Sequence, residues 1–405
     1  MSVCLGWLFV ASATITYAGQ FALALAAAAT GHVAELWHVY LAGLASLAVA
    51  LCLNTVGVRM LNNVNKLTIV FANVFIVFLF VSLLAKTYPK ADASTVFVDV
   101  ANETGWSSDG LVFLLALLPG VSVVGMFDTA AHLSEELPRP DRLVPRVMIF
   151  TSMLSAFMTV VVTLALLFCL RHPENLLEPL GGMPILQLCW DAWPNRGYVV
   201  TVMACYTFSN ILSVIGCVFA GSRLVWSFSK SGAFPFAEWL SKVNKRLKVP
   251  LNAVATFGVL SAIVILLILG PSTVLNALLG SAVILISVAY TMPIVLLLFK
   301  GRSVLPPNRS FNLGRAGIVV NSLALCWISL VVVFLSFPMY RPTTPDNMNW
   351  GTPCALGLLL LTVLNWFVRK GSYRSLHGLY TEGLHGAPHG EIESGLGQGR
   401  AVEIS

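Results

Sequence analysis

The chain has 405 residues, of which 57% are apolar and only 10% are charged, and its mean hydropathy is +0.83. Soluble domains average about 25% charged residues, so this composition excludes an ordinary water-soluble globule and favours a membrane protein. The net charge of +6 does not indicate a nucleic-acid partner, because the basic residues lie in short loops between apolar runs. The eight cysteines have no metal-type spacing, so we expect no metal site and no disulfide framework.

Ten apolar stretches are long enough to cross a bilayer, which takes about 20 helical residues. They cover residues 4–30, 38–58, 65–85, 109–132, 145–170, 197–225, 251–270, 272–299, 316–338 and 350–369. The first stretch lacks the basic start of a signal peptide and is too long for one, so we interpret it as a span. The sequence predicts an all-α transmembrane domain over 1–370 and a cytoplasmic, disordered tail over 371–405.

The distribution of lysine and arginine predicts the orientation. With the N-terminus in the cytoplasm, 19 of these residues fall in inside segments and 5 in outside segments. Positive residues are enriched on the cytoplasmic side of membrane proteins, so both termini are expected to be cytoplasmic. The Asn102-Glu-Thr sequon then lies outside, where glycosylation is possible.

The span 109–132 contains Pro119, Gly120 and Gly125 near its middle. Proline removes an intrahelical hydrogen bond and glycine tolerates non-helical dihedrals, so these residues predict a helix break. In lipid, the freed backbone groups survive only against protein or a water-filled cavity, and transporters use such breaks to hold charged substrate groups. From these residues alone, a plain proline kink is an equally good interpretation.

Asp128 follows the predicted break directly. An ionisable residue inside a span is costly and therefore indicates function. It could hold a substrate ammonium or take part in proton coupling, and the alternative is that it caps the second half-helix or pairs with a neighbouring helix. Further along the chain, a cluster of charged residues comprises Glu135, Glu136 and Arg139. We interpret it as a solvated network in a loop, and the functional alternative is an inner gate.

Other polar side chains lie deep in the first, sixth and eighth spans, where they either join helices or line a cavity. Those for which a cavity role is considered are Tyr17, Gln20, Tyr206 and Asn210. The spans contain no constellation of paired carboxylates and no phosphate-binding glycine loop, so we expect neither an enzyme nor an ATP-driven pump, and no cofactor.

Residues 125–148, GMFDTAAHLSEELPRPDRLVPRVM, resemble the stretch after the sixth helix of fungal members of the amino acid–polyamine–organocation superfamily. The resemblance is closest to the fungal amino acid, GABA and choline permeases. Residues 222–253 resemble the cytoplasmic loop of that family, and 311–338 with MNW at 348–350 resemble its last two helices. The resemblance implies a leucine-transporter-like bundle of twelve helices, with two inverted five-helix repeats and broken first and sixth helices around the substrate.

On this resemblance the span 4–30 corresponds to the third family helix, so the chain is expected to lack the first two helices and to hold an incomplete first repeat. The absent first helix normally holds the substrate carboxylate with its unwound backbone. The matching motif implies that the contacts to the substrate or a gate come from Ser122, Gly125, Phe127 and Asp128.

The expected function is secondary active, proton-coupled transport of an amino acid, GABA, choline or a polyamine. The plasma membrane is the expected location, with the vacuolar membrane as the alternative. The competing hypothesis is a truncated, non-transporting membrane protein, whether an incomplete gene model, a regulatory variant or a degenerate copy.

Overall fold

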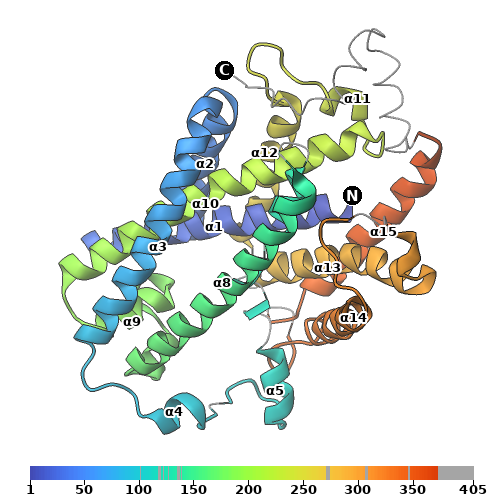
Figure 1. The fold of residues 1–405 in the computed structure, drawn as a ribbon. Coiled ribbons are helices and arrows are strands. Elements are labelled where there is room, and N and C mark those ends of the chain that lie inside the picture. The colour runs from blue at the N-terminus through green and yellow to red at the C-terminus, as the bar shows by residue number, and fades with distance from the viewer. Residues whose placement is uncertain are drawn as a thin grey trace.

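The computed structural model describes residues 1–100, 102–116, 120–121, 123–125, 127–134, 137, 139–270, 274–305, 309–344 and 347–372. These residues form helices joined by turns, and the one β pairing among them is an isolated bridge between Asn244 and Val249. The α-helices (Figure 1) are α1 (Ser2–Thr30), α2 (Leu36–Thr55), α3 (Leu61–Lys86), α4 (Ala93–Phe97), α5 (Asp109–Leu115), α7 (Thr129–His132), α8 (Pro140–Cys169), α9 (Pro184–Ala192), α10 (Arg196–Lys230), α11 (Ala237–Leu240), α12 (Leu251–Ile265), α13 (Val274–Lys300), α14 (Ala316–Phe334) and α15 (Gly351–Arg369). Short 3-10 turns are η1 (Val58–Met60), η3 (Pro173–Leu176), η4 (Leu180–Gly182), η5 (Leu266–Leu269), η6 (Arg302–Val304) and η7 (Lys370–Ser372).

Within the described part of the chain, nine helical segments are long and apolar enough to span a membrane. They coincide with nine of the ten stretches expected from the sequence, and the all-α membrane fold is therefore confirmed. These segments are Ser2–Thr30, Leu36–Thr55, Val58–Lys86, Pro140–Cys169, Arg196–Lys230, Leu251–Leu269, Val274–Lys300, Ala316–Phe334 and Gly351–Ser372.

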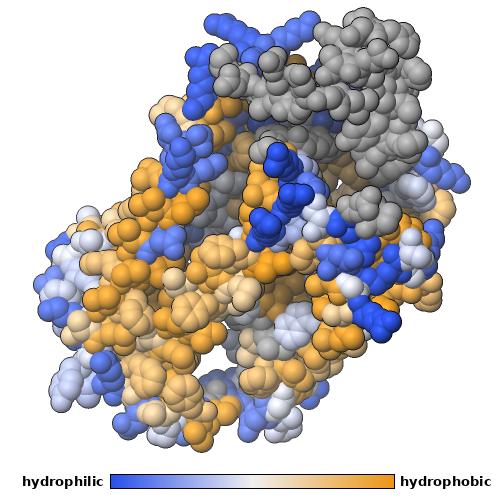
Figure 2. All heavy atoms as spheres, in the orientation of Figure 1, coloured by the Kyte–Doolittle hydropathy of each residue, from blue (hydrophilic) through white to orange (hydrophobic). Residues whose placement is uncertain are grey.

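The outward faces of the peripheral helices are apolar. Phe150 and Phe157 on α8 are 69% and 63% exposed, and Leu323 on α14 is 64% exposed. Figure 2 shows hydrophobic residues over the middle of the visible face and hydrophilic residues gathered toward its margins. A contiguous apolar surface of this kind is stable against lipid but not against water.

The core of the bundle forms around α1, which packs against α2, α10, α12 and α13 (Figure 1). The α1 and α10 helices are antiparallel, because Phe21 stacks on Tyr206 while Thr14 lies 3.7 Å from the sulfur of Cys217. Several α1 side chains are fully enclosed, including Ala11 and Ile15 at 0% exposure.

A glycine allows α1 and α2 to approach closely. A Cβ atom placed on Gly19 would lie 2.4 Å from the carbonyl oxygen of Val39, a distance that no real side chain occupies. Membrane helices commonly use small residues in this way, because lipid gives apolar helix surfaces no strong reason to associate and close van der Waals packing must supply the attraction.

The segment 109–132 is not one continuous helix in the part of it that the structure describes. α5 ends at Leu115, residues 120, 121 and 123 are helical, Gly125 is outside any helix, and α7 begins only at Thr129. The expected break at Pro119 and the contact expected at Ser122 lie outside the described residues, whereas Gly120 is in one of the helical positions. Asp128 follows this interruption, and its side chain lies within hydrogen-bonding reach of α1 and α13.

Candidate functional site

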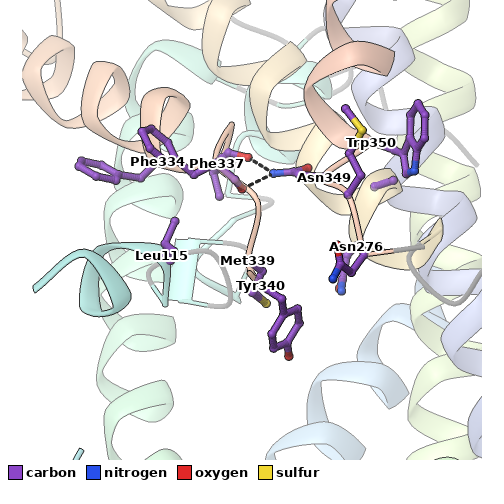
Figure 3. A pocket seen from close by; sticks show the side chains of 13 residues that line it. Leu115, Asn276, Phe334, Phe337, Met339, Tyr340, Asn349 and Trp350 are labelled. Atoms are coloured by element: carbon purple, nitrogen blue, oxygen red, sulfur yellow. Dashed lines mark hydrogen bonds between the residues drawn. The ribbon is translucent and has the colours of Figure 1, made fainter. Parts of the chain in front are cut away.

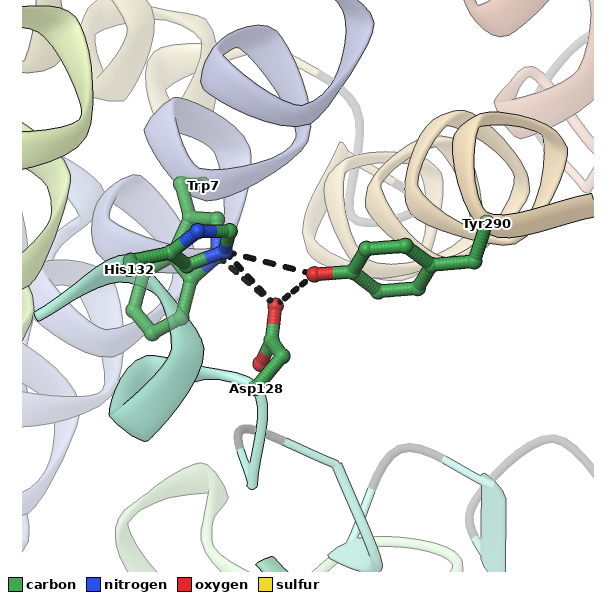
Figure 4. Close-up of polar contacts among 4 residues, drawn as sticks. All are labelled: Trp7, Asp128, His132 and Tyr290. Atoms are coloured by element: carbon green, nitrogen blue, oxygen red, sulfur yellow. Dashed lines mark hydrogen bonds and ion pairs between the residues drawn. The ribbon is translucent and has the colours of Figure 1, made fainter. Parts of the chain in front are cut away.

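Asp128 is buried among three helical elements, with only 5% of its surface exposed. It directly precedes α7, yet its side chain makes no capping hydrogen bond to that helix. The carboxylate instead lies between α1 and α13 (Figure 4). The Asp128 side chain therefore pairs with neighbouring helices and does not cap α7.

Three donors converge on a single oxygen of this carboxylate, Oδ2. The indole nitrogen of Trp7 on α1 donates to it over 3.2 Å, and Nε2 of His132 at the end of α7 lies 3.1 Å away. The hydroxyl of Tyr290 on α13 also donates to Oδ2 and lies 3.2 Å from His132 Nε2. We refer to Trp7, Asp128, His132 and Tyr290 as the Asp128 cluster (Figure 4).

The other oxygen, Oδ1, receives no hydrogen bond from any residue that the structure describes. Hydrogen bonds to a charged group contribute about 1.5–3 kcal/mol each, so the three donors offset part of the cost of burying Asp128. They also fix the orientation of the carboxylate. Among the described residues, the cluster thus leaves Oδ1 as an acceptor that a cationic guest or a proton can approach.

Two rings of the cluster, those of Trp7 and His132, pack against each other. Trp7 is 2% exposed, and its ring meets that of His132 edge-on, with 6.1 Å between centroids and an interplanar angle of 84°. His132 is a second group that can bind a proton, and its side chain is 14% exposed. In the described residues no group of three or more His, Cys, Asp or Glu side chains is arranged to hold a metal ion.

The other site residues predicted near the helix break differ in how deeply they are buried. Gly125 is half-buried, and Phe127 is 36% exposed, so it does not join Asp128 in the interior. Arg139 is exposed and precedes α8 in a left-handed conformation with φ 51°. Its expected neighbours Glu135 and Glu136 lie outside the described residues.

The expected cavity residues on α1 and α10 form a separate region. Tyr17 and Gln20 are half-buried, and with a rise of 1.5 Å per residue they lie roughly 15 and 20 Å along α1 from Trp7. Tyr206 stacks on Phe21 with centroids 4.9 Å apart. Asn210 donates over 3.0 Å to the backbone carbonyl of Tyr206 within its own helix. The structure therefore does not bring these four expected residues to the Asp128 cluster.

Three members of the cluster were not predicted as site residues from the sequence. His132 follows Asp128 by four positions, a spacing that places two helical side chains on one face and that could have indicated the pair. Trp7 and Tyr290 are 121 and 162 positions away from Asp128. Their only sequence signal is an aromatic residue with a polar tip inside an apolar span.

A cavity of about 260 Å³ lies at the start of α13, and none of the four residues of the Asp128 cluster lines it. Its wall includes Asn276 on α13, Leu115 of α5 and aromatic rings of the loop between α14 and α15 (Figure 3). Asn349 closes this loop by donating to the carbonyls of Leu335 and Phe337, the latter over 2.9 Å. The described lining contains no charged side chain.

The sequence matches the family model described as amino acid permease over residues 1–360. It is 29% identical to the choline transporter of Saccharomyces cerevisiae over 287 residues, covering 71% of this chain and 51% of that protein. It is 26% identical to amino-acid permease 2 of Neurospora crassa, covering 79% of this chain and 59% of the relative.

A rice relative, the amino-acid permease BAT1 homolog of Oryza sativa, is 31% identical, with 71% of this chain and 58% of the relative covered. The chain thus spans between half and three fifths of the length of these relatives. The match over residues 1–360 includes every described membrane-spanning segment except the end of the last. The resemblance found in the sequence is confirmed, and the chain belongs to the amino acid permease family, whose members are membrane transporters and not enzymes.

Proposed function

We propose that this chain forms part of a secondary active carrier for a small organic solute with a positively charged nitrogen, such as an amino acid, GABA, choline or a polyamine. The observation that carries the proposal is the buried carboxylate of Asp128 beside an interrupted helix, with Oδ2 filled by three donors and Oδ1 without a described donor. A cation placed at Oδ1 would complete the contacts of that carboxylate.

The chemistry of Asp128 suits a cationic group more than an anionic one. Charge interactions strengthen as the local dielectric falls, so a buried carboxylate attracts an ammonium more strongly than a solvated carboxylate does. Intramembrane ionisable residues are retained at this cost mainly along substrate or proton pathways. An ammonium can also donate a hydrogen bond to Oδ1, whereas a quaternary nitrogen such as that of choline would be held by charge alone.

The names of the relatives agree with this chemistry. One relative is called a choline transporter and two are called amino-acid permeases. Choline and amino acids share a positively charged nitrogen and differ in whether they carry a carboxylate. A carboxylate at Asp128 recognises the shared group, so it supports the class of solute without selecting one member.

Proton coupling is part of the proposal. Nε2 of His132 lies 3.1 Å from Oδ2 of Asp128, the oxygen that also accepts hydrogen bonds from Tyr290 and Trp7. A proton on His132 would change the net charge of the cluster, so proton binding and substrate binding would be thermodynamically linked through one carboxylate. The expected inner gate at Glu135, Glu136 and Arg139 belongs to the same proposed cycle.

The proposed orientation places both termini in the cytoplasm, on the count of 19 inside and 5 outside basic residues. In that orientation Trp7, near the start of α1, places the Asp128 cluster toward the cytoplasmic half of the bundle. The proposed location is the plasma membrane or the vacuolar membrane. Labelling of cysteines introduced at Asn102 and Lys245 by a membrane-impermeant reagent on intact cells would test the orientation, with Asn102 expected to react.

Uptake of labelled amino acids, GABA, choline and putrescine by cells without their own permeases tests the function. We expect saturable uptake of at least one of these solutes by a carrier of the relatives' length that contains this chain, and poor uptake by the 405 residues alone. In the longer form, uptake should fall by more than about tenfold in Asp128→Asn, which keeps the side-chain size and removes the charge. Asp99→Asn is the matched control, because Asp99 is exposed. The amount of protein in the membrane should be the same for all three.

Two outcomes would contradict the proposal in different ways. Unchanged uptake in Asp128→Asn would remove Asp128 from the mechanism while leaving transport intact. If the wild type inserted into the membrane and no solute in the panel accumulated, the hypothesis of a non-transporting membrane protein would be favoured instead.

A further inference from the structure

A cavity of about 670 Å³ lies where α10 and α15 end. The other end of α10 lies near Trp193, the residue after α9, whose ring contacts Lys86 at the end of α3. Two cationic side chains line it, Lys230 from the last turn of α10 and Arg369 from the last turn of α15. The remaining wall comes largely from the loop after α10, including Phe236, Glu238 and Ser241. Two spanning helices therefore place positive charge on one pocket at their shared end.

The loop between α10 and α12 is folded against the helices. The indole of Trp226 on α10 donates over 3.0 Å to the carbonyl of Ser241. The amide of Asn252 on α12 donates over 2.8 Å to the carbonyl of Trp239, and Asn365 on α15 donates over 2.9 Å to the carbonyl of Ala233. Because three helices hold it, this loop can keep a pocket open in a fixed shape.

Beyond the pocket, a tight turn presents more positive charge. The turn is closed by the bridge between Asn244 and Val249, and the Asn244 side-chain oxygen accepts hydrogen bonds from the backbone nitrogens of Arg246 and Leu247. Four cationic side chains of the loop are exposed, Lys242, Lys245, Arg246 and Lys248. Between residues 229 and 250 the sequence contains one acidic residue, Glu238, against five basic ones.

Large aromatic side chains adjoin the basic groups. Phe236, in a left-handed conformation with φ 57°, is 79% exposed, and Trp239 is 49% exposed. The ammonium of Lys230 lies 3.5 Å from the centre of the Trp226 ring. Exposed aromatic rings at the ends of spanning helices are typical of the membrane–water interface, where one side of the ring is apolar and the other is wet.

We propose that this pocket and the adjoining basic turn bind the phosphate headgroup of an anionic phospholipid, with Lys230 and Arg369 facing the phosphate and the turn at 242–248 facing the surrounding anionic surface. Clusters of four or more basic residues next to the cytoplasmic end of a spanning helix, and basic pockets between such helices, bind anionic headgroups in membrane proteins. The exposed aromatic rings favour a ligand that has acyl chains over a free phosphate. In the proposed orientation this end faces the cytoplasmic leaflet, which carries the anionic lipids.

The test measures association of fluorescent phosphatidylserine with the purified chain, reconstituted in nanodiscs of phosphatidylcholine. Lys230→Gln combined with Arg369→Gln alters the pocket, and Lys245→Gln combined with Arg246→Gln alters the exposed turn. We expect each neutralised cation to weaken binding by about fivefold. The matched control is Lys90→Gln with Arg171→Gln, because both of these residues are exposed near the other end of the bundle.

Several outcomes would overturn this inference. Equal binding of labelled phosphatidylserine and phosphatidylcholine would remove the requirement for an anionic headgroup. Equal weakening in the control variant would show a general charge effect and not a site, and displacement of the labelled lipid by inorganic phosphate alone would assign the pocket to a free anion. The turn variant keeps the test decisive if the pocket variant unfolds, because Lys245 and Arg246 are exposed.

Discussion

The two ends of α1 both carry polar side chains, but their surroundings differ. Near its start, Trp7 donates to the buried carboxylate of Asp128, beside a segment that is interrupted at Gly125. Toward its end, Tyr17 and Gln20 are half-buried beside Phe21, which stacks on Tyr206 of α10. Polar residues of one span therefore form a charged cluster in one region and adjoin an aromatic contact in the other.

The difference follows from the backbone that faces each end. Where the opposing segment is broken, the Asp128 side chain can be approached from α1, α7 and α13 together. Where α1, α3 and α10 are unbroken, their side chains pack ring against ring, and the Tyr206 ring meets both Phe21 and Phe75. An interrupted helix thus creates a polar site, whereas continuous helices bury or satisfy their polar groups locally.

The largest effect is expected from Gly19→Ala, because α1 supports both regions. The added Cβ would lie 2.4 Å from the Val39 carbonyl, so α1 and α2 would have to move apart, at a cost of about 1–3 kcal/mol. Thermal unfolding of the purified protein measures this loss. Gly216→Ala on α10 is the matched control, because no heavy atom lies within 4 Å of its added Cβ; equal unfolding temperatures for the two variants would show that the α1–α2 contact is not tight.

Tyr290→Phe is expected to have the next largest effect, confined to the Asp128 cluster. It removes the hydroxyl that donates to Oδ2 while the ring remains, and the loss of a hydrogen bond to a charged group corresponds to about tenfold or more in uptake. Tyr198→Phe is the control, because its hydroxyl lies 3.1 Å from Ser82 at the other end of the bundle. Equal uptake by both variants would mean that Tyr290 does not orient the carboxylate for transport.

His132→Gln tests whether the cluster binds the coupling proton. Glutamine can still donate a hydrogen bond to Asp128, but its amide cannot take up a proton, whereas an imidazole ring can. Among the described residues, His132 contacts Asp128, Tyr290 and the Trp7 ring, and the variant leaves all three in place. We expect uptake to persist at a level reduced severalfold and to lose much of its dependence on an imposed proton gradient. An unaltered dependence on the proton gradient would place the coupling proton elsewhere.

Sequence reasoning predicted the spans because each is a long apolar run, and it singled out Asp128 because a carboxylate inside such a run is costly. It could not predict that Trp7 and Tyr290 would be its partners, since those contacts join spans that are 121 and 162 residues away along the chain. The sequence also could not show that Tyr206 and Asn210 lie away from the Asp128 cluster. A membrane helix is apolar on most of its faces, so the pattern of residues does not show which face meets a cavity.

Tyr206→Phe should have the smallest effect, and it tests the comparison directly. The Tyr206 ring is held by stacking on Phe21 at 4.9 Å and by edge contact with Phe75 at 4.8 Å, and no described residue forms a hydrogen bond with its hydroxyl. Removing the hydroxyl should therefore change the free energy of unfolding and uptake very little, within about 0.5 kcal/mol. If Tyr206→Phe lost uptake while its unfolding temperature stayed unchanged, the hydroxyl would contact the solute, and the far end of α1 would belong to the transport path after all.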